Sequence, residues 1–298
     1  MSTFNPAVRS RTGKTPAVKK SKSHLRKLWA DRSWNVLGLA IAAVLALPIY
    51  WMLNTAFQPA VIISEKPHLF PSNLSFSNFS YAMHSFDWWT CVKNSLIITA
   101  IVVVIGLVIG FAGALAIARF RFHGRKAFIV VVLIIQMIPM IVLLIPLFLQ
   151  MQNFNLVNNL PGVIIVYMVF NLPYTIWTLR GFISNVPREL DEAALVDGCN
   201  RWQTFTKVIF PLAAPGLVAT AVYGAIQALN EFIVVSTFNT SDGVRTITIW
   251  LVDNTTQRGT AWGPLMAGAT MMTLPIVFMF LLVQKNISAG ITAGAVKG

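Results

Sequence analysis

Long apolar stretches alternate with shorter polar ones along most of the chain. Six apolar runs are each long enough for a membrane-spanning helix, which requires roughly 20 residues. They cover residues 34–57, 94–118, 127–150, 160–180, 212–236 and 264–284. The third run contains Pro139 and Pro146, and we expect a kink there because proline removes a helical hydrogen bond. The pattern predicts an all-α polytopic membrane protein with six transmembrane helices.

The composition supports this class. Hydrophobic residues make up 56% of the chain and charged residues 11%, whereas soluble domains carry about 25% charged residues. The two cysteines, Cys91 and Cys199, imply no disulfide framework, and the four histidines show no metal-ligand spacing. No catalytic or phosphate-binding motif is found in the sequence, so we expect neither an enzyme nor a bound cofactor or metal.

The basic residues indicate the orientation of the helices. With both termini in the cytoplasm, 19 of the 23 Lys and Arg residues fall in inner segments, as the positive-inside rule requires. We therefore expect a basic cytoplasmic tail over 1–33, a six-span domain over 34–285 and a cytoplasmic tail over 286–298. The basic tail is expected to be disordered at first and then to lie beside the membrane. This distribution accounts for the net charge of +13 better than nucleic-acid binding does.

The segment 187–211, between the fourth and fifth apolar runs, is polar and is predicted to form a cytoplasmic helical hairpin. Pro187 suits the first position of a helix, acidic residues follow it at the positive end of the helix dipole, and Gly198 suits a left-handed turn. Asn200 can cap a second short helix that runs through Phe205, and Pro211 is expected to limit it. One face of the first helix carries Leu190, Ala193, Ala194 and Asp197. The two alanines are expected on the exposed, open face, where they would let another protein surface approach closely.

This segment resembles the signature loop of inner-membrane permease subunits of binding-protein-dependent ABC importers. The resemblance rests on Glu192-Ala193-Ala194, Gly198, Val208, Phe210 and Pro211, where Val208 and Phe210 replace the usual Ile and Leu. It extends over nearly the whole chain and is closest to the maltose-permease type. It implies contact with a partner ATPase through Glu192, Ala193, Ala194, Asp197, Gly198 and Arg201. An amphipathic helix on the bilayer surface is the structural alternative.

The resemblance also implies a function and partners. The chain would form one half of the pore of an importer for a disaccharide or oligosaccharide, of the maltose or trehalose type, working by alternating access in the bacterial inner membrane. The implied partners are a second permease subunit, two ATP-binding subunits, an extracytoplasmic sugar-binding protein and membrane lipid. One alternative is an ABC permease for a polyamine, peptide or glycerol phosphate. Another is an ion-coupled secondary transporter, which should show inverted repeats.

Polar residues inside the apolar runs are candidates for a substrate path. Glu231 lies in the fifth run, where a carboxylate costs roughly 2.5–3.5 kcal/mol at the bilayer centre, so it should face the bundle interior or a water-filled path. A hydrogen bond or ion pair between helices explains it equally well. The other candidates are Gln136, Asn171, Tyr174, Gln227 and Asn230. In the second run, Gly106 and Gly110 predict close helix packing.

The last outer loop, 237–263, is rich in Thr and Asn and carries Trp250 and Trp262. Aromatic faces suit stacking on sugar rings, and in maltose-type permeases the corresponding loop reaches towards the docked binding protein. We therefore expect Trp250 and Asp253 to contact that protein. Anchoring at headgroup depth is the alternative for the tryptophans, and the favoured one for Trp262.

Overall fold

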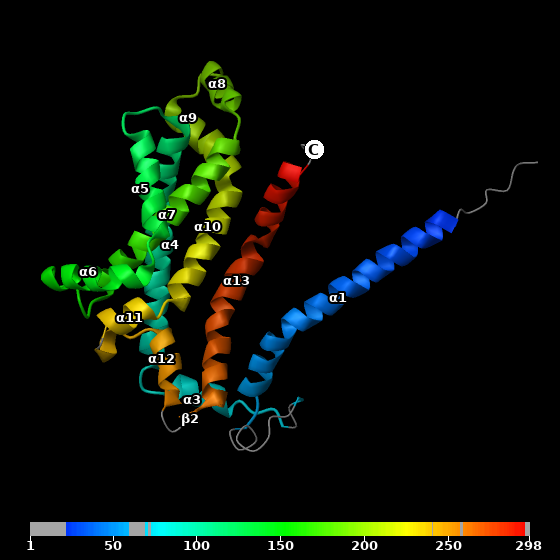
Figure 1. Cartoon of the computed structure of the whole chain (residues 1–298), viewed down its shortest axis with the longest axis vertical. Helices are drawn as coiled ribbons and strands as arrows, with labels where there is room; N and C mark the ends of the chain where they lie inside the picture. The colour runs from blue at the N-terminus through cyan, green and yellow to red at the C-terminus, as the bar shows by residue number, and fades with distance from the viewer. Residues whose placement is uncertain (1–21, 60–68, 71–72, 240, 257–258, 296–298) are drawn as a thin grey trace, which may run out of the picture. The chain divides into compact units, whose positions relative to one another are not determined.

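The computed structural model describes residues 22–59, 69–70, 73–239, 241–256 and 259–295. Nearly all of the regular structure is helical (Figure 1), as the sequence predicts. The longer helices are α1 (Lys22–Ala56), α4 (Trp88–Arg119), α5 (Arg125–Met137), α6 (Met140–Asn153), α7 (Leu160–Asn185), α10 (Phe210–Asn230) and α13 (Trp262–Ala295). The shorter ones are α3 (Ser77–His84), α8 (Arg188–Val196), α9 (Arg201–Thr204), α11 (Ile233–Phe238) and α12 (Ile247–Asp253). A π-helix η1 (Phe205–Ile209), a 3₁₀ turn η2 (Asp242–Val244) and an antiparallel pair β1 (Thr255–Thr256) and β2 (Gly259–Thr260) complete the structure.

The chain divides into two compact units, residues 1–51 and 52–298. The first unit holds most of α1, whose apolar part spans Trp34–Ala56. This helix begins at Lys22, within the segment predicted as a tail, because lysine and arginine are good helix formers and extend the helix beyond its apolar part. The predicted disorder of residues 1–21 lies outside the described residues.

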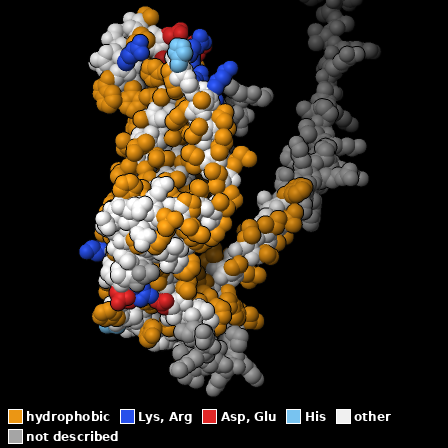
Figure 2. Space-filling model, turned by 60° about the vertical axis from the view of Figure 1, so that its left-hand side comes forward, with side chains coloured by type: hydrophobic (Ala, Val, Ile, Leu, Met, Phe, Trp, Pro, Cys, Tyr) orange, Lys and Arg blue, Asp and Glu red, His pale blue; other side chains and the backbone are white. Residues whose placement is uncertain are grey.

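The second unit contains the other long apolar helices. Within the described residues, five helices are long and apolar enough to cross a membrane, and the bent pair α5–α6 raises the count to six if it forms one span. α4, α7 and α10 pack against one another, and α13 packs against α10 (Figure 1). Figure 2 shows a broad hydrophobic zone on this unit, with charged side chains gathered mainly at its two ends. The prediction of a polytopic all-α membrane protein is confirmed.

The third apolar run is broken rather than kinked. α5 ends at Met137, Ile138 is extended, and α6 starts at Met140 after a bend of 102°. A residue that precedes proline avoids the helical conformation, which explains the break at Ile138–Pro139. Pro146 lies inside α6 and does not end it, so only one of the two prolines expected to kink the run interrupts it.

The prediction of a short second hairpin helix, running through Phe205 and limited by Pro211, is wrong. α9, η1 and α10 form one helix from Arg201 to Asn230. In the π-helical turn, the Phe210 N–H donates to the Phe205 carbonyl, five residues earlier, and this wider turn accommodates a proline ring that would otherwise clash with the preceding turn. The fifth span therefore starts within the hairpin, and α10 ends six residues before the predicted limit at 236.

Small residues set the distance between the central helices. A Cβ atom added at Gly110 of α4 would lie 2.3 Å from the Thr175 methyl group of α7. One added at Gly216 of α10 would lie 2.4 Å from the Phe182 ring of α7. Both helices approach α7 more closely than a larger residue allows, which confirms the packing role predicted for the Gly106 and Gly110 pair.

The segment predicted as the last outer loop is largely structured. η2, α12 and the β1–β2 pair lie within it, and its side chains form a hydrophobic cluster with the preceding elements. This cluster consists of Ala82, Trp88, Cys91, Ile247 and Trp250. At the other end of α13 the helix continues to Ala295, so most of the tail predicted over 286–298 is helical.

Candidate functional site

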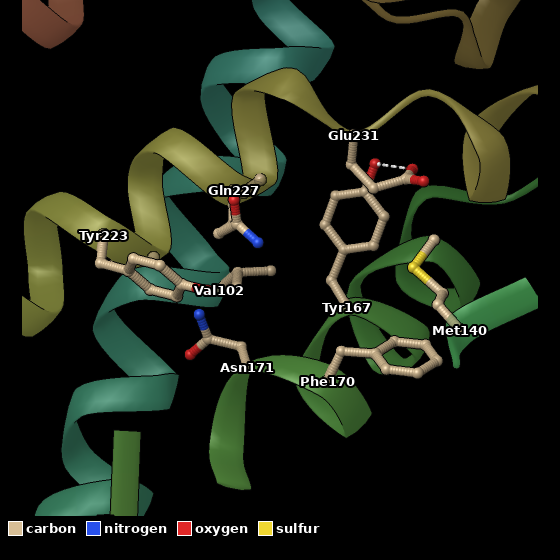
Figure 3. Close-up of a pocket in the computed structure, with 10 residues that line it drawn as sticks. Val102, Met140, Tyr167, Phe170, Asn171, Tyr223, Gln227 and Glu231 are labelled. Carbon is tan, nitrogen blue, oxygen red and sulfur yellow. Dashed lines mark hydrogen bonds between the residues drawn. The ribbon is translucent and has the colours of Figure 1, made fainter. Parts of the chain in front are cut away.

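A cavity of about 90 Å³ lies among α4, α7 and α10 (Figure 3). Its lining residues are Val102, Met140, Tyr167, Phe170, Asn171, Tyr223, Gly224, Gln227, Ala228 and Glu231. The side chains of Asn171, Gln227 and Tyr223 are turned towards the same space (Figure 3). The wall therefore combines aromatic faces with amide and carboxylate groups, a mixture that suits a polar molecule with apolar ring faces.

Asn171 is held by two glycines on opposite sides. A Cβ atom at Gly106 of α4 would lie 2.7 Å from Asn171 Oδ1, and one at Gly224 of α10 would lie 2.9 Å from its Nδ2. The Thr175 hydroxyl donates a 3.0 Å hydrogen bond to Oδ1. The amide is thereby fixed between three helices, and the absence of side chains at both glycines is what admits it.

Glu231 lies at the break between α10 and α11, just beyond the end of the fifth span. Its Oε2 accepts a 2.7 Å hydrogen bond from the Tyr167 hydroxyl, and its Oε1 accepts one of 2.9 Å from the Val234 N–H. The carboxylate thus links α7 to the first turn of α11 while it also borders the cavity. The hydrogen-bond alternative considered for Glu231 is therefore present in the structure, together with the expected orientation into the bundle.

Of the other residues proposed for the path, some lie at the cavity and some do not. Asn171 and Gln227 line the cavity, and the Tyr174 ring stacks on Tyr223, with centroids 3.8 Å apart and planes at 25°. Gln136 of α5 and Asn230 at the end of α10 are exposed and do not line it.

Sequence reasoning missed Tyr167 and Tyr223. Tyr167 precedes Asn171 by four residues, and Tyr223 precedes Gln227 by four. Residues at this spacing share a helix face, and that signal could have identified both.

The hairpin turns at Gly198, as predicted. Gly198 has φ of +87°, and the Cys199 N–H donates to the Ala194 carbonyl at 2.9 Å, which is the glycine-dependent way to end a helix. The next helix is capped reciprocally by Asn200 and Gln203, with both hydrogen bonds at 2.9 Å. The geometry of the turn is therefore set by local hydrogen bonds.

The base of the hairpin is bound to the end of α4. Arg119 forms a 2.9 Å ion pair with Asp191 and donates to the Val186 carbonyl, also at 2.9 Å. Arg188 donates to the Ala118 carbonyl at 3.0 Å. This clamp could not be predicted from the sequence, because Arg119 and Asp191 lie 72 positions apart and neither stands out in its own segment.

The residues predicted to contact an ATPase do not share one environment. Glu192, Ala193, Asp197 and Gly198 are exposed, whereas Ala194 is 8% exposed and belongs to the interior. The prediction that both alanines lie on the open face is wrong for Ala194. Arg201 starts α9 and lines the space between the hairpin and the end of α4.

Comparison with known proteins identifies this arrangement. Residues 103–293 match the model of the binding-protein-dependent transport system inner membrane component. The chain belongs to this family. The matched region covers the hairpin and, apart from Val102, all the residues that line the cavity.

Two relatives extend the match over almost their full length. The permease is 43% identical to the diacetylchitobiose uptake system permease protein DasC of Streptomyces coelicolor, over 90% of this chain and 98% of DasC. It is 34% identical to the trehalose transport system permease protein SugB of Mycobacterium tuberculosis, over 89% of this chain and 97% of SugB. A crystal structure of a bacterial ABC transporter involved in the import of the acidic polysaccharide alginate has the same fold, with a TM-score of 0.70, 22% identity, and coverage of 89% of this chain and 98% of that one.

The segment 237–263 differs from the sequence prediction at Trp250. This side chain is 6% exposed, its ring packs edge-on against Trp88 with centroids 4.7 Å apart, and its Nε1 donates to Ser85 Oγ at 2.9 Å. Its ring therefore belongs to the hydrophobic cluster with Ala82, Trp88, Cys91 and Ile247 and offers no surface for stacking on a sugar. Asp253 is exposed and forms an ion pair with Arg245, which also pairs with Asp87 at 2.9 Å.

Proposed function

We propose that the chain is the permease subunit of an ABC importer that carries a disaccharide or oligosaccharide across the bacterial inner membrane. The observation that carries the proposal is the 43% identity to a diacetylchitobiose permease over 98% of that protein. The relative that is named for trehalose transport supports the same substrate class. These relatives disfavour the polyamine, peptide, glycerol phosphate and ion-coupled alternatives.

The partners follow from the family. A second permease subunit completes the pore, two ATP-binding subunits hydrolyse ATP, and an extracytoplasmic binding protein delivers the sugar. The cavity of about 90 Å³ is a small recess, and its lining residues all come from this one chain. We therefore assign it to one wall of the path, which widens when the two permease subunits separate on one side of the membrane.

The chemistry of this wall suits a sugar. The Tyr223 ring, which lines the cavity and stacks on Tyr174, supplies an apolar face. The Asn171 and Gln227 amides supply hydrogen-bond donors and acceptors for hydroxyl or acetamido groups. Glu231, whose oxygens already accept from Tyr167 and from the backbone, acts chiefly to hold the end of the fifth span against α7. Specificity then rests on the amides more than on the carboxylate.

The hairpin passes the movements of the ATP-binding subunits to the membrane helices. Glu192, Ala193 and Asp197 on its exposed surface contact the ATP-binding subunit. Movement of the turn passes along the continuous helix from Arg201 to Asn230, whose last turns border the cavity, and reaches α4 through the clamp at Arg119. The same two helices thus connect the ATPase contact with the substrate path, and this connection is the physical basis of alternating access.

The hairpin end is assigned to the cytoplasm. The excess of basic residues in the segments on that side supports this orientation, which also places both termini there. Asp253 and the adjoining part of the outer face remain our candidates for contact with the binding protein.

The substrate class is tested with the extracytoplasmic binding protein that works with this permease. The purified binding protein is screened by calorimetry against disaccharides, amino acids, peptides and polyamines, and the best ligand is then used for uptake in cells with and without the permease. We expect binding of a disaccharide and its permease-dependent uptake. Tight binding of a polyamine or peptide, with no response to any sugar, would contradict the proposal.

A further inference from the structure

A large apolar groove runs between α4 and the continuous helix Arg201–Asn230. Its volume is about 870 Å³, and it is distinct from the cavity at Tyr167. The walls come from α4 and from the continuous α9–η1–α10 helix. The apolar lining residues are Val104, Leu107, Val108, Phe111, Ala112, Leu115, Trp202, Phe205, Phe210 and Leu217.

Positive charge lies at one end of this groove. Arg201 lines the groove, and it also lines a second space of about 280 Å³ that Arg119 and Arg188 border. The two spaces share Leu115, Arg201 and Phe205, so they adjoin. The apolar groove therefore lies next to a polar chamber lined by Arg119, Arg188, Arg201, Asp191 and Glu192.

The three arginines differ in whether their guanidinium groups make hydrogen bonds or ion pairs. Arg119 pairs with Asp191, and Arg188 donates to the Ala118 carbonyl. Within the described residues, the Arg201 guanidinium makes no hydrogen bond or ion pair, and Asp191 Oδ1 is buried without a hydrogen-bond partner. The lining of this chamber therefore includes a guanidinium group that makes no ion pair with a described residue and a carboxylate oxygen that lacks a hydrogen-bond donor.

We propose that this groove and chamber bind an anionic phospholipid with a hydroxylated headgroup, of the phosphatidylglycerol type. The acyl chains occupy the apolar groove, the phosphate pairs with Arg201, and the headgroup hydroxyls reach Asp191. Basic pockets between membrane helices on the cytoplasmic side are suited to anionic headgroups. Trp202, which is 70% exposed at the same end, is a residue type that favours headgroup depth.

This assignment changes the role of Arg201. The sequence analysis predicts that Arg201 contacts an ATPase. Because Arg201 lines both the groove and the chamber, we assign it to lipid binding. A lipid held there would contact α4 and the hairpin at once, beside the Arg119–Asp191 pair, and would link the coupling hairpin to the composition of the inner leaflet. The proposal does not depend on which sugar is carried.

The test measures lipid retention by the permease complex, purified in detergent with its partner subunits, by native mass spectrometry. Phosphatidylglycerol, phosphatidylethanolamine and inorganic phosphate are titrated separately. Arg201→Gln removes the cation, Arg201→Lys keeps it, and Ala112→Trp fills the groove. Arg121→Gln is the matched control, because Arg121 is exposed in the adjacent α4–α5 loop and lines neither space.

We expect phosphatidylglycerol to be retained in preference to phosphatidylethanolamine, and its binding to weaken about fivefold in Arg201→Gln. Ala112→Trp should also weaken it, whereas Arg201→Lys and Arg121→Gln should retain it. Unchanged binding in Arg201→Gln and Ala112→Trp, an equal loss in Arg121→Gln, or displacement of the lipid by inorganic phosphate would overturn the proposal.

A second experiment identifies the occupant without removing any charge. A photocrosslinking residue placed at position 112 of the complex in native membranes should capture lipid, detected as a mass increase on the permease. Capture of a partner subunit in place of lipid would mean that the groove is a protein interface, and would also overturn the proposal.

Discussion

Arg119, the last residue of α4, forms a 2.9 Å ion pair with Asp191 in the first helix of the hairpin. The two side chains are 8% and 19% exposed, so water and salt screen the pair less than they screen a surface pair. The same arginine donates to the Val186 carbonyl just before the hairpin. A displacement of α8 is therefore transmitted to α4 directly, as well as through the chain to α10.

Asp191→Asn tests this clamp. The variant keeps the shape of the side chain and removes its charge, which should cost about 1.5–3 kcal/mol of local stability for a charge-assisted contact. We expect binding-protein-stimulated ATP hydrolysis and sugar uptake to fall severalfold while membrane insertion stays normal. Glu189→Gln, at an exposed acid in the same helix, is the control. Equal uptake by the two variants would remove the clamp from the coupling route.

The turn at Gly198 gives a second prediction. A Cβ atom there would meet nothing within 4 Å, so the φ of +87° is the only obstacle to another residue. Alanine in this conformation costs about 1–2 kcal/mol, and asparagine less, because it is the other common residue at this position. Uptake should therefore be reduced more in Gly198→Ala than in Gly198→Asn, at equal protein levels in the membrane. The reverse order would mean that the turn has a different conformation in the assembled transporter.

The packing of Asn171 between Gly106 and Gly224 gives a third prediction. Gly106→Ala forces a Cβ atom to within 2.7 Å of Asn171 Oδ1, and overpacking of this kind costs about 1–3 kcal/mol. Combining it with Asn171→Ala should cost less than the sum of the single changes, since the clash is then absent. Thermal unfolding in detergent measures this cycle. Gly181→Ala, at a site with open space, should be close to neutral, and additive losses in the cycle would contradict the packing.

Thiol labelling tests the orientation. Cys91 is fully buried and Cys199 is half-buried beside the exposed turn. An impermeant maleimide should modify Cys199 in inside-out vesicles and leave it unmodified in intact cells, whereas Cys91 should stay unmodified in both. Modification of Cys199 in intact cells would place the hairpin outside and exclude contact with an ATPase.

The apolar runs and the glycine turn were predictable because their causes are local. Run length, the left-handed preference of glycine and the capping of a helix by Asn200 are each read within a few residues. The predictions made from proline in the third apolar run and in the second hairpin helix show the limit of local reasoning. Pro139 breaks its run, Pro146 does not, and Pro211 follows a π-helical turn within a continuous helix. The residue before each proline has the same preference against the helical conformation, so this local rule does not predict which proline ends a helix.

The candidate site was less predictable because its contacts are distant in sequence. Tyr167 meets Glu231 across 64 positions, and the burial of Trp250 depends on Trp88 and Ser85 in an earlier segment. A tryptophan in a loop that also carries Thr and Asn suggests an exposed aromatic face. Only the tertiary structure places its ring in the core.

The central claim is that this permease imports a sugar and that its exposed hairpin couples import to ATP hydrolysis. The most direct measurement is simultaneous ATP hydrolysis and uptake of labelled disaccharide in proteoliposomes that contain the permease, its partner subunits and the binding protein. Wild-type vesicles should accumulate the disaccharide only with ATP, and Glu192→Lys vesicles should lose uptake together with the stimulation of hydrolysis by the binding protein. ATP-driven uptake of a non-sugar solute alone, or undiminished disaccharide uptake by Glu192→Lys, would contradict the account.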